Sequence, residues 1–168
     1  HSDTEVLLAA IAHWGLEATL SRLIGMFAFA VWDAARQRLV LVRDRLGKKP
    51  LYYGWWGRRF VFASELKALG QLPGFAPPID RRALALLLRH NYVPGPWSIY
   101  RDVYKLPPGS LLELGHPLDR PAARPYWSLE QVVAQGTENP FRGTVEEAAG
   151  ELERLLADAV RRRMIADV

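Results

Sequence analysis

Residues 25–53 read GMFAFAVWDAARQRLVLVRDRLGKKPLYY, and the other predicted elements are arranged around the sheet that they form. Residues 26–32 alternate large and small side chains, as a strand with one bulky and one smooth face requires. Residues 39–42 are apolar without alternation, which predicts a strand buried on both faces. The short polar segment between these strands predicts an antiparallel hairpin. After a charged turn at 43–50, the apolar run 51–56 predicts a third strand.

Helices flank this sheet in the predicted order of elements. Ser2 and Glu5 fit a capping box at the start of a helix over 3–14, and a short helix follows at 17–22. Later strands are predicted at 60–63, 110–114 and 124–127. Two helices are predicted between them, one capped by Ser64 that runs through residue 69 and one capped by Asp80 at 81–90. A final helix starts with a capping box of Thr144 and Glu147 and runs to about residue 166.

The composition predicts a globular protein of ordinary size. The 168 residues are 49% hydrophobic, enough to fill a core. The sequence has no long apolar run and no signal-peptide pattern, so we expect a cytoplasmic protein without a membrane partner. A net charge of +4 raises the question of nucleic acid. Because basic and acidic residues are interspersed, we interpret this charge as a solvated surface and expect no nucleic-acid partner.

Side chains suited to catalysis are few. The 168 residues contain no cysteine, which excludes disulfides and thiolate chemistry within them. The four histidines lack the short spacing of metal sites, so no metal site is predicted. Because neither a Gly-x-Ser-x-Gly frame nor a Gly-x-x-x-x-Gly-Lys loop occurs, the sequence indicates no catalytic residue and no nucleotide site.

Asp3 is a candidate binding residue. As an acid in the first turn of a helix it is favoured by the helix dipole, and spacing alone supports this interpretation. The alternative follows from Ser2 and Glu5, which already cap the helix. They leave the Asp3 carboxylate available for the ammonium group of a ligand.

The charged turn is a second candidate. Such turns are usually solvated, but Asp44 lies between two arginines and is able to form a salt-bridged corner. This corner would fix Gly47 and Pro50, which punctuate the turn. We therefore interpret Arg43, Asp44, Gly47 and Pro50 as structural residues.

Six segments in order carry a family resemblance: SDTEVLLAAIAHWG, GMFAFAVWD, LVRDRLGKKPLYY, FASELKAL, KLPPGSLLEL and PYW. They resemble the class II glutamine amidotransferase domain of glutamine-hydrolysing asparagine synthetases, continuing into the start of the synthetase domain. The resemblance implies an α+β fold, an N-terminal-nucleophile hydrolase-type sandwich of antiparallel sheets with flanking helices. It also implies a partial amidotransferase domain at 1–115, a linker at 116–143 and the first helix of the synthetase domain at 144–168.

The resemblance assigns roles to the candidate residues. The family's Ser-Asp-Thr-Glu aspartate binds the α-amino group of glutamine, so the resemblance makes Asp3 the expected glutamine-binding residue. This replaces the helix-dipole interpretation, which the spacing alone supports. Arg43, Asp44, Gly47 and Pro50 match the family's Arg-Asp-x-x-Gly-x-x-Pro turn, a structural support. The family's nucleophilic cysteine, arginine-bearing loop and Asn-Gly oxyanion segment precede Ser-Asp-Thr-Glu and have no counterpart here. We therefore expect an N-terminally truncated domain that is inactive by itself.

For a complete protein of this kind, the resemblance implies a two-site reaction. L-Glutamine is hydrolysed to ammonia, and a second site uses ATP and Mg²⁺ to amidate L-aspartate to asparagine. The family's Ser-Gly-Gly-x-Asp-Ser loop for ATP is absent from these residues, so we expect this chain to bind neither cofactor. Homodimerisation is left open.

Three alternatives are considered. A β-lactam-forming synthetase, or another specialised amidotransferase of the superfamily, would serve a different acceptor with the same domain. A basic nucleic-acid-binding module would be retained on DNA with a steep salt dependence. A non-catalytic interaction domain would use its edge strands and fold stably without a ligand.

Overall fold

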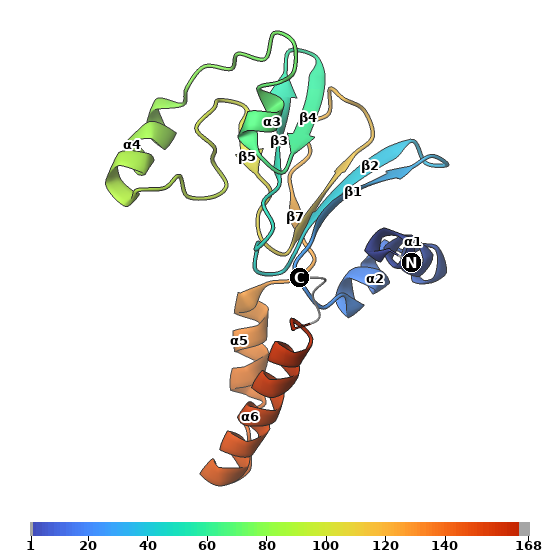
Figure 1. Cartoon of the computed structure of the whole chain (residues 1–168), viewed down its shortest axis with the longest axis vertical. Coiled ribbons are helices and arrows are strands. Elements are labelled where there is room, and N and C mark those ends of the chain that lie inside the picture. Colours follow the sequence, from blue (N-terminus) through green and yellow to red (C-terminus); the bar gives the residue numbers. More distant parts are fainter. Residues whose placement is uncertain (1, 165–168) are drawn as a thin grey trace. The chain divides into compact units, whose positions relative to one another are not determined.

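The structure is a computed structural model that describes residues 2–164. It divides into two compact units, His1–Ser128 and Leu129–Val168. Figure 1 shows the helices and strands of both units and labels all of them except β6.

Two helices begin the first unit, α1 (Asp3–Trp14) and α2 (Leu16–Arg22). The hydroxyl of Ser2 accepts a hydrogen bond from the backbone N–H of Glu5 at 3.3 Å, so the predicted N-cap of α1 is confirmed. Between the helices, Gly15 has a φ of +79°, a conformation in which glycine avoids the strain of a side chain.

The strands of the first unit form two antiparallel sheets. The first sheet has the order β1-β2-β6-β7 and the second has the order β4-β3-β5. Residue 28 pairs with residue 43 and residue 33 with residue 38, so the hairpin that the sequence predicts is confirmed. The strands are β1 (Ala28–Asp33), β2 (Arg38–Arg43), β3 (Tyr52–Trp56), β4 (Arg59–Ala63), β5 (Val103–Lys105), β6 (Ser110–Leu114) and β7 (Arg124–Pro125).

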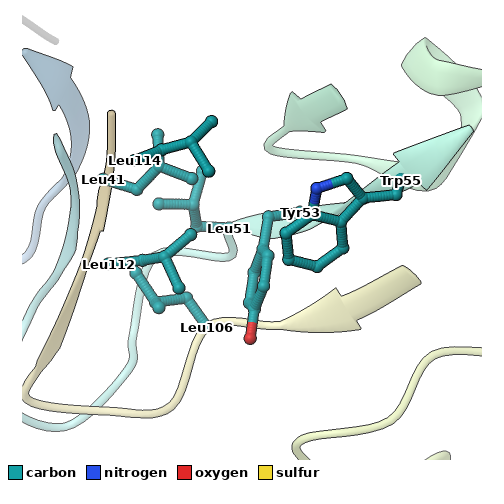
Figure 2. Close-up of a cluster of buried hydrophobic side chains, with 7 residues drawn as sticks. All are labelled: Leu41, Leu51, Tyr53, Trp55, Leu106, Leu112 and Leu114. Carbon is teal, nitrogen blue, oxygen red and sulfur yellow. The ribbon is translucent and has the colours of Figure 1, made fainter. Parts of the chain in front are cut away.

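A hydrophobic core lies between the two sheets. Strands β2 and β6 of the first sheet contribute leucines, and β3 of the second sheet contributes aromatic rings. The rings of Tyr53 and Trp55 meet edge to face, with centroids 6.0 Å apart. Figure 2 shows the buried cluster, which consists of Leu41, Leu51, Tyr53, Trp55, Leu106, Leu112 and Leu114.

One helix packs against the outer face of each sheet. Leu20 of α2 packs against Val40 and Val42 on the outer face of the first sheet. Leu69 of the short helix α3 (Leu66–Leu69) packs against Val61 of the second sheet. The layers therefore run helix, sheet, sheet, helix. The expected α+β architecture of antiparallel sheets with helices is confirmed, whereas its assignment to the N-terminal-nucleophile hydrolase type stays a prediction.

Strand β2 is buried on both faces, as its unbroken apolar run predicts. Val40, Leu41 and Val42 are 3%, 0% and 0% exposed. Leu41 faces the other sheet, while the two valines face α2. This strand thus connects the central core with the helical layer.

Two local predictions were wrong in detail. Helix α3 begins after Glu65 without a side-chain cap, so Ser64 is not its N-cap. In the predicted strand 124–127, only the first two residues pair with β6. The backbone N–H groups of Tyr126 and Trp127 instead donate to the carbonyl of Gly109, which ends the ladder.

Helix α4 (Arg81–His90) has the predicted bounds and cap. The Asp80 carboxylate accepts the N–H of Arg82 at 2.8 Å. Asn91 ends the helix in the left-handed conformation, with a φ of +60°.

The second unit contains α5 (Leu129–Glu138) and α6 (Val145–Arg161). The capping box of α6 is confirmed, because Thr144 and Glu147 each bond to the other's backbone N–H, at 3.2 and 2.8 Å. Helix α6 ends at Arg161, earlier than predicted, and the end of that prediction lies outside the described residues. Among the residues described, no helix is both long and apolar enough to span a membrane.

The stretch 116–143 is more regular than a linker of prolines and glycines suggests. It contains both β7 and α5, and the division between the two units falls within it, after Ser128. Helix α5 was not predicted, although its Leu129, Val132 and Val133 recur at helical spacing. The domain bounds 1–115, 116–143 and 144–168 stay predictions.

Candidate functional site

Asp3 lies at the head of α1 with an exposed side chain. Its carboxylate has no hydrogen-bond or ion-pair partner within residues 2–164. Ser2 supplies the cap of the helix, so the carboxylate of Asp3 is not needed for capping. This acid therefore remains available to a ligand.

Asp3 faces a cleft of about 440 Å³ where four parts of the first unit meet. Among the described residues that line it, Asp3 is the only acidic one and Lys49 the only basic one, while Phe27 and Phe29 contribute half-buried rings. The cleft thus combines both signs of charge with an apolar wall. Its lining consists of Asp3, Thr4 and Leu7 of α1, residues 26–29 at the start of β1, Lys49 and Pro50 of the charged turn, and Ser64 after β4.

The guanidinium of Arg43 holds the charged turn through three backbone carbonyls. Nε donates to the carbonyl of Lys49 at 2.8 Å, Nη1 to that of Leu106 at 2.6 Å and Nη2 to that of Gly47 at 2.7 Å. Burial lowers the pKa of Arg43, and the nearby charge of Asp44 opposes this effect. These hydrogen bonds offset the free-energy cost of removing part of the guanidinium from water.

The carboxylate of Asp44 organises the same turn from inside. It is 1% exposed. Oδ1 accepts the N–H groups of Leu46 at 3.2 Å and Lys48 at 2.9 Å, and Oδ2 accepts that of Lys49 at 2.9 Å. The sequence suggested a salt bridge with the neighbouring arginines, but within residues 2–164 this carboxylate bonds to backbone amides instead. Asp44 therefore determines the path of the backbone that leads into the cleft wall.

The backbone of the turn is tied to both neighbouring segments. The N–H of Asp44 donates to the carbonyl of Phe27 at 2.9 Å, and its carbonyl accepts the N–H of Gly109 at 2.8 Å. The hydroxyl of Tyr126 donates to the carbonyl of Arg43 at 2.9 Å. Burial raises the pKa of Tyr126 to about 12, so this hydroxyl keeps its proton at neutral pH.

Gly47 meets a conformational and a steric requirement of the turn. Its φ is +62°, where a residue with a side chain is strained. A Cβ at this position would lie 2.9 Å from Cγ of Pro108 and 3.1 Å from Cζ of Arg43. Pro50, at the end of the turn, contributes to the cleft wall rather than to these hydrogen bonds.

Residues 1–127 match the model of one protein family, described as a glutamine amidotransferase domain. The chain belongs to this family. Asparagine synthetase [glutamine-hydrolyzing] 3 of Bacillus subtilis is 33% identical to the chain over 169 residues. These residues cover 99% of the chain and 26% of that protein.

Two further relatives show similar coverage. A putative asparagine synthetase [glutamine-hydrolyzing] of Mycobacterium tuberculosis is 35% identical over 170 residues, 99% of the chain and 25% of that protein. Amidase chry2 of Gibberella zeae is 36% identical over 168 residues, 100% of the chain and 24% of that protein. The chain thus spans about a quarter of the length of these relatives, and its resemblance to the asparagine synthetase family is confirmed.

Some contacts that hold the charged turn were missed from the sequence. Leu106, Gly109 and Tyr126 each bond to the turn, and all three lie in segments that carry the family resemblance. Their place in these segments was the one sign in the sequence that they belong with the turn. Among residues 2–164, no group of three or more His, Asp or Glu side chains is arranged to hold a metal ion.

Proposed function

We propose that this chain forms the glutamine-binding part of a glutamine-dependent amidotransferase, and that Asp3 binds the α-ammonium of L-glutamine. The observation that carries this proposal is the carboxylate of Asp3, which has no partner within residues 2–164 and shares the described lining of the cleft with one other charged side chain, Lys49. A carboxylate and an ammonium form a strong, charge-assisted hydrogen bond. The two opposite charges suit a zwitterionic amino acid.

The charged turn has a positioning role in this proposal. The carboxylate of Asp44 accepts the backbone N–H of Lys49, and the guanidinium of Arg43 donates to the backbone carbonyl of Lys49. The backbone of Lys49 is therefore fixed on both sides. Lys49 and Pro50 form one wall of the cleft and Asp3 lies on another. Arg43, Asp44 and Gly47 therefore act on the ligand through the wall that they hold in place.

For the whole protein, we extend the proposal to asparagine synthesis. Ammonia from L-glutamine would be used with ATP and Mg²⁺ to amidate L-aspartate, at a site outside these residues. Relatives named asparagine synthetase [glutamine-hydrolyzing] support this assignment. Because the 168 residues hold no cysteine, we expect the isolated chain to release no ammonia from L-glutamine. Ammonia above a buffer blank would contradict that expectation.

Binding to the isolated chain tests the role of Asp3 directly. L-Glutamine is titrated by NMR against glutaramate, which has the same amide and carboxylate but lacks the α-ammonium. We expect Asp3→Asn to weaken L-glutamine binding about tenfold, the value of one charged hydrogen bond, and to leave glutaramate unchanged. Equal affinities of the Asp3→Asn and unmodified chains for L-glutamine would overturn the assignment.

Kinetics of the complete protein that carries this sequence provide the functional test. We expect Asp3→Asn to raise the KM for L-glutamine about 10- to 100-fold while ammonia-dependent synthesis stays nearly unchanged. Asp33→Asn is the matched control, because this acid lies at the far end of β1 and does not line the cleft. An equal loss of both activities in Asp3→Asn would show a structural role instead.

A further inference from the structure

A second cavity, of about 360 Å³, lies beside the start of α4 and shares no residue with the Asp3 cleft. Two adjacent arginines of α4, Arg81 and Arg82, line one side of it. The opposite side belongs to the segment that leads into β5. This segment provides a third arginine, Arg101, and the rings of Trp97 and Tyr100, and β5 itself provides the ring of Tyr104.

Backbone hydrogen bonds hold the two sides of this cavity together. Ile79 and Tyr100 form an isolated antiparallel bridge. Next to it, the N–H of Asp80 donates to the carbonyl of Ile99 at 2.9 Å, and the N–H of Arg101 donates to that of Pro78 at 3.0 Å. The cavity is therefore framed by paired backbone and does not depend on a single loop.

The three arginines of this cavity have no local partner. Arg81, Arg82 and Arg101 are exposed, and within residues 2–164 their side chains form no ion pair or hydrogen bond. The positions of the first two in the opening turn of α4 are electrostatically unfavourable, because the helix dipole disfavours cations there. Helix stability therefore does not account for them.

The two carboxylates in the lining are engaged elsewhere. Asp80 caps α4 by accepting the N–H of Arg82 at 2.8 Å. Asp102 lies 3.8 Å from Arg120, which also stacks over the ring of Trp55. Neither carboxylate forms an ion pair with the three cavity arginines, so the cavity keeps an excess of positive charge.

Trp97 offers an unoccupied aromatic face. The residue is 43% exposed, and its ring stacks on no other ring or cation among the described residues. The other two rings are already packed, Tyr100 against Phe75 at 6.2 Å and Tyr104 against Tyr53 at 5.9 Å between centroids. Trp97 is therefore the ring of this cavity that is free to stack on a ligand.

From these features we propose that the cavity binds a nucleoside monophosphate. The guanidinium groups of Arg81, Arg82 and Arg101 take the phosphate, for which planar, forked donors are well suited. The base stacks on Trp97, as nucleobases do on exposed aromatic side chains. A volume of about 360 Å³ lies at the small end of ligand sites, which suits one nucleotide.

The test uses AMP as the probe, with inorganic phosphate and adenosine as its two halves. Isothermal titration of the 168-residue chain should show that AMP binds about tenfold or more tightly than either half, because it engages both the arginines and the ring. Arg81→Gln combined with Arg101→Gln should weaken AMP binding about tenfold. Arg58→Gln combined with Arg59→Gln removes the same charge at the β3–β4 turn and should change binding less than about twofold.

Several outcomes would overturn this proposal. AMP that binds no more tightly than phosphate refutes a site for the base, and an unchanged affinity in the Arg81 and Arg101 variant refutes the assigned phosphate site. An equal loss in the control variant shows a general effect of charge. Should the cavity variant not fold, the indole N–H resonance of Trp97 in the unmodified chain decides. This resonance is identified by its loss from the spectrum of the Trp97→Phe variant. If the proposal is right, it shifts when AMP is added.

Discussion

Replacement of Asp44 by alanine should destabilise the first unit more than the loss of any exposed acid. The carboxylate is 1% exposed and accepts the N–H groups of Leu46, Lys48 and Lys49. A hydrogen bond to a charged group contributes about 1.5–3 kcal/mol, but such contributions are not additive. Water can reach part of the exposed turn after the substitution. We therefore expect Asp44→Ala to lower the free energy of unfolding by about 3–5 kcal/mol.

Asparagine at the same position separates shape from charge. Its side-chain oxygen can replace Oδ1, which accepts the N–H groups of Leu46 and Lys48. Its amide nitrogen cannot accept the N–H of Lys49, which Oδ2 accepts at 2.9 Å. We expect Asp44→Asn to cost about 2–3 kcal/mol, less than alanine at this position.

Guanidinium denaturation followed by tryptophan fluorescence measures these losses. All six tryptophans lie in the unit His1–Ser128, so the signal reports the unfolding of that unit alone. Asp33→Ala is the control, because Asp33 also accepts a backbone N–H, that of Arg36 at 3.0 Å, but at a more exposed turn. The Asp33→Ala variant should lose clearly less stability than Asp44→Ala, because water screens and replaces the interactions of an exposed carboxylate. A loss below about 1 kcal/mol in Asp44→Ala would refute the structural role of the buried carboxylate.

Three further predictions concern the same turn. Gly47→Ala should destabilise the first unit by about 3 kcal/mol in the same denaturation assay, because it adds contact with Pro108 to the cost of a positive φ. Gly57→Ala, at a nearly equal φ of +61° in open space, should cost only about 1 kcal/mol, and equal losses would show that the contact is unimportant. Tyr126→Phe should cost about 1 kcal/mol through the lost hydrogen bond to Arg43, and an unchanged midpoint would contradict this. Because burial raises the pKa of Tyr126 from 10.0 to about 12, the folded state favours the protonated phenol. Stability should therefore fall between about pH 10 and 12 in unfolding experiments, and less steeply in the phenylalanine variant.

The parts of the fold that depend on local interactions were predictable from the sequence. Ser2, Asp80 and Thr144 each cap a helix by bonding to an N–H two or three residues away. The hairpin of β1 and β2 follows from the alternation of side chains and the short polar segment between the strands. These interactions lie within a few residues, so the sequence pattern contains the necessary information.

Where local signals were weak or competing, prediction from the sequence was wrong. Ser64 is a good capping residue, but α3 starts one position later, after Glu65. Helix α5 lies in a stretch with several glycines and prolines, which hid its short helical periodicity. Strand β7 ends at Pro125 because the carbonyl of Gly109 takes the next two N–H groups, a contact from another part of the chain.

The sequence alone determined the family, the central hairpin and the residue types of the charged turn. The hydrogen-bond partners of those residues became known from the folded structure. Arg43 reaches the carbonyl of Leu106, and Asp44 bonds to backbone amides rather than to its arginine neighbours. Likewise, Asp3 and Pro50 share a cleft because the packed sheets bring the head of α1 close to the turn. Capping and strand pairing act over neighbouring residues, whereas a cleft depends on distant segments that meet only after the core has packed.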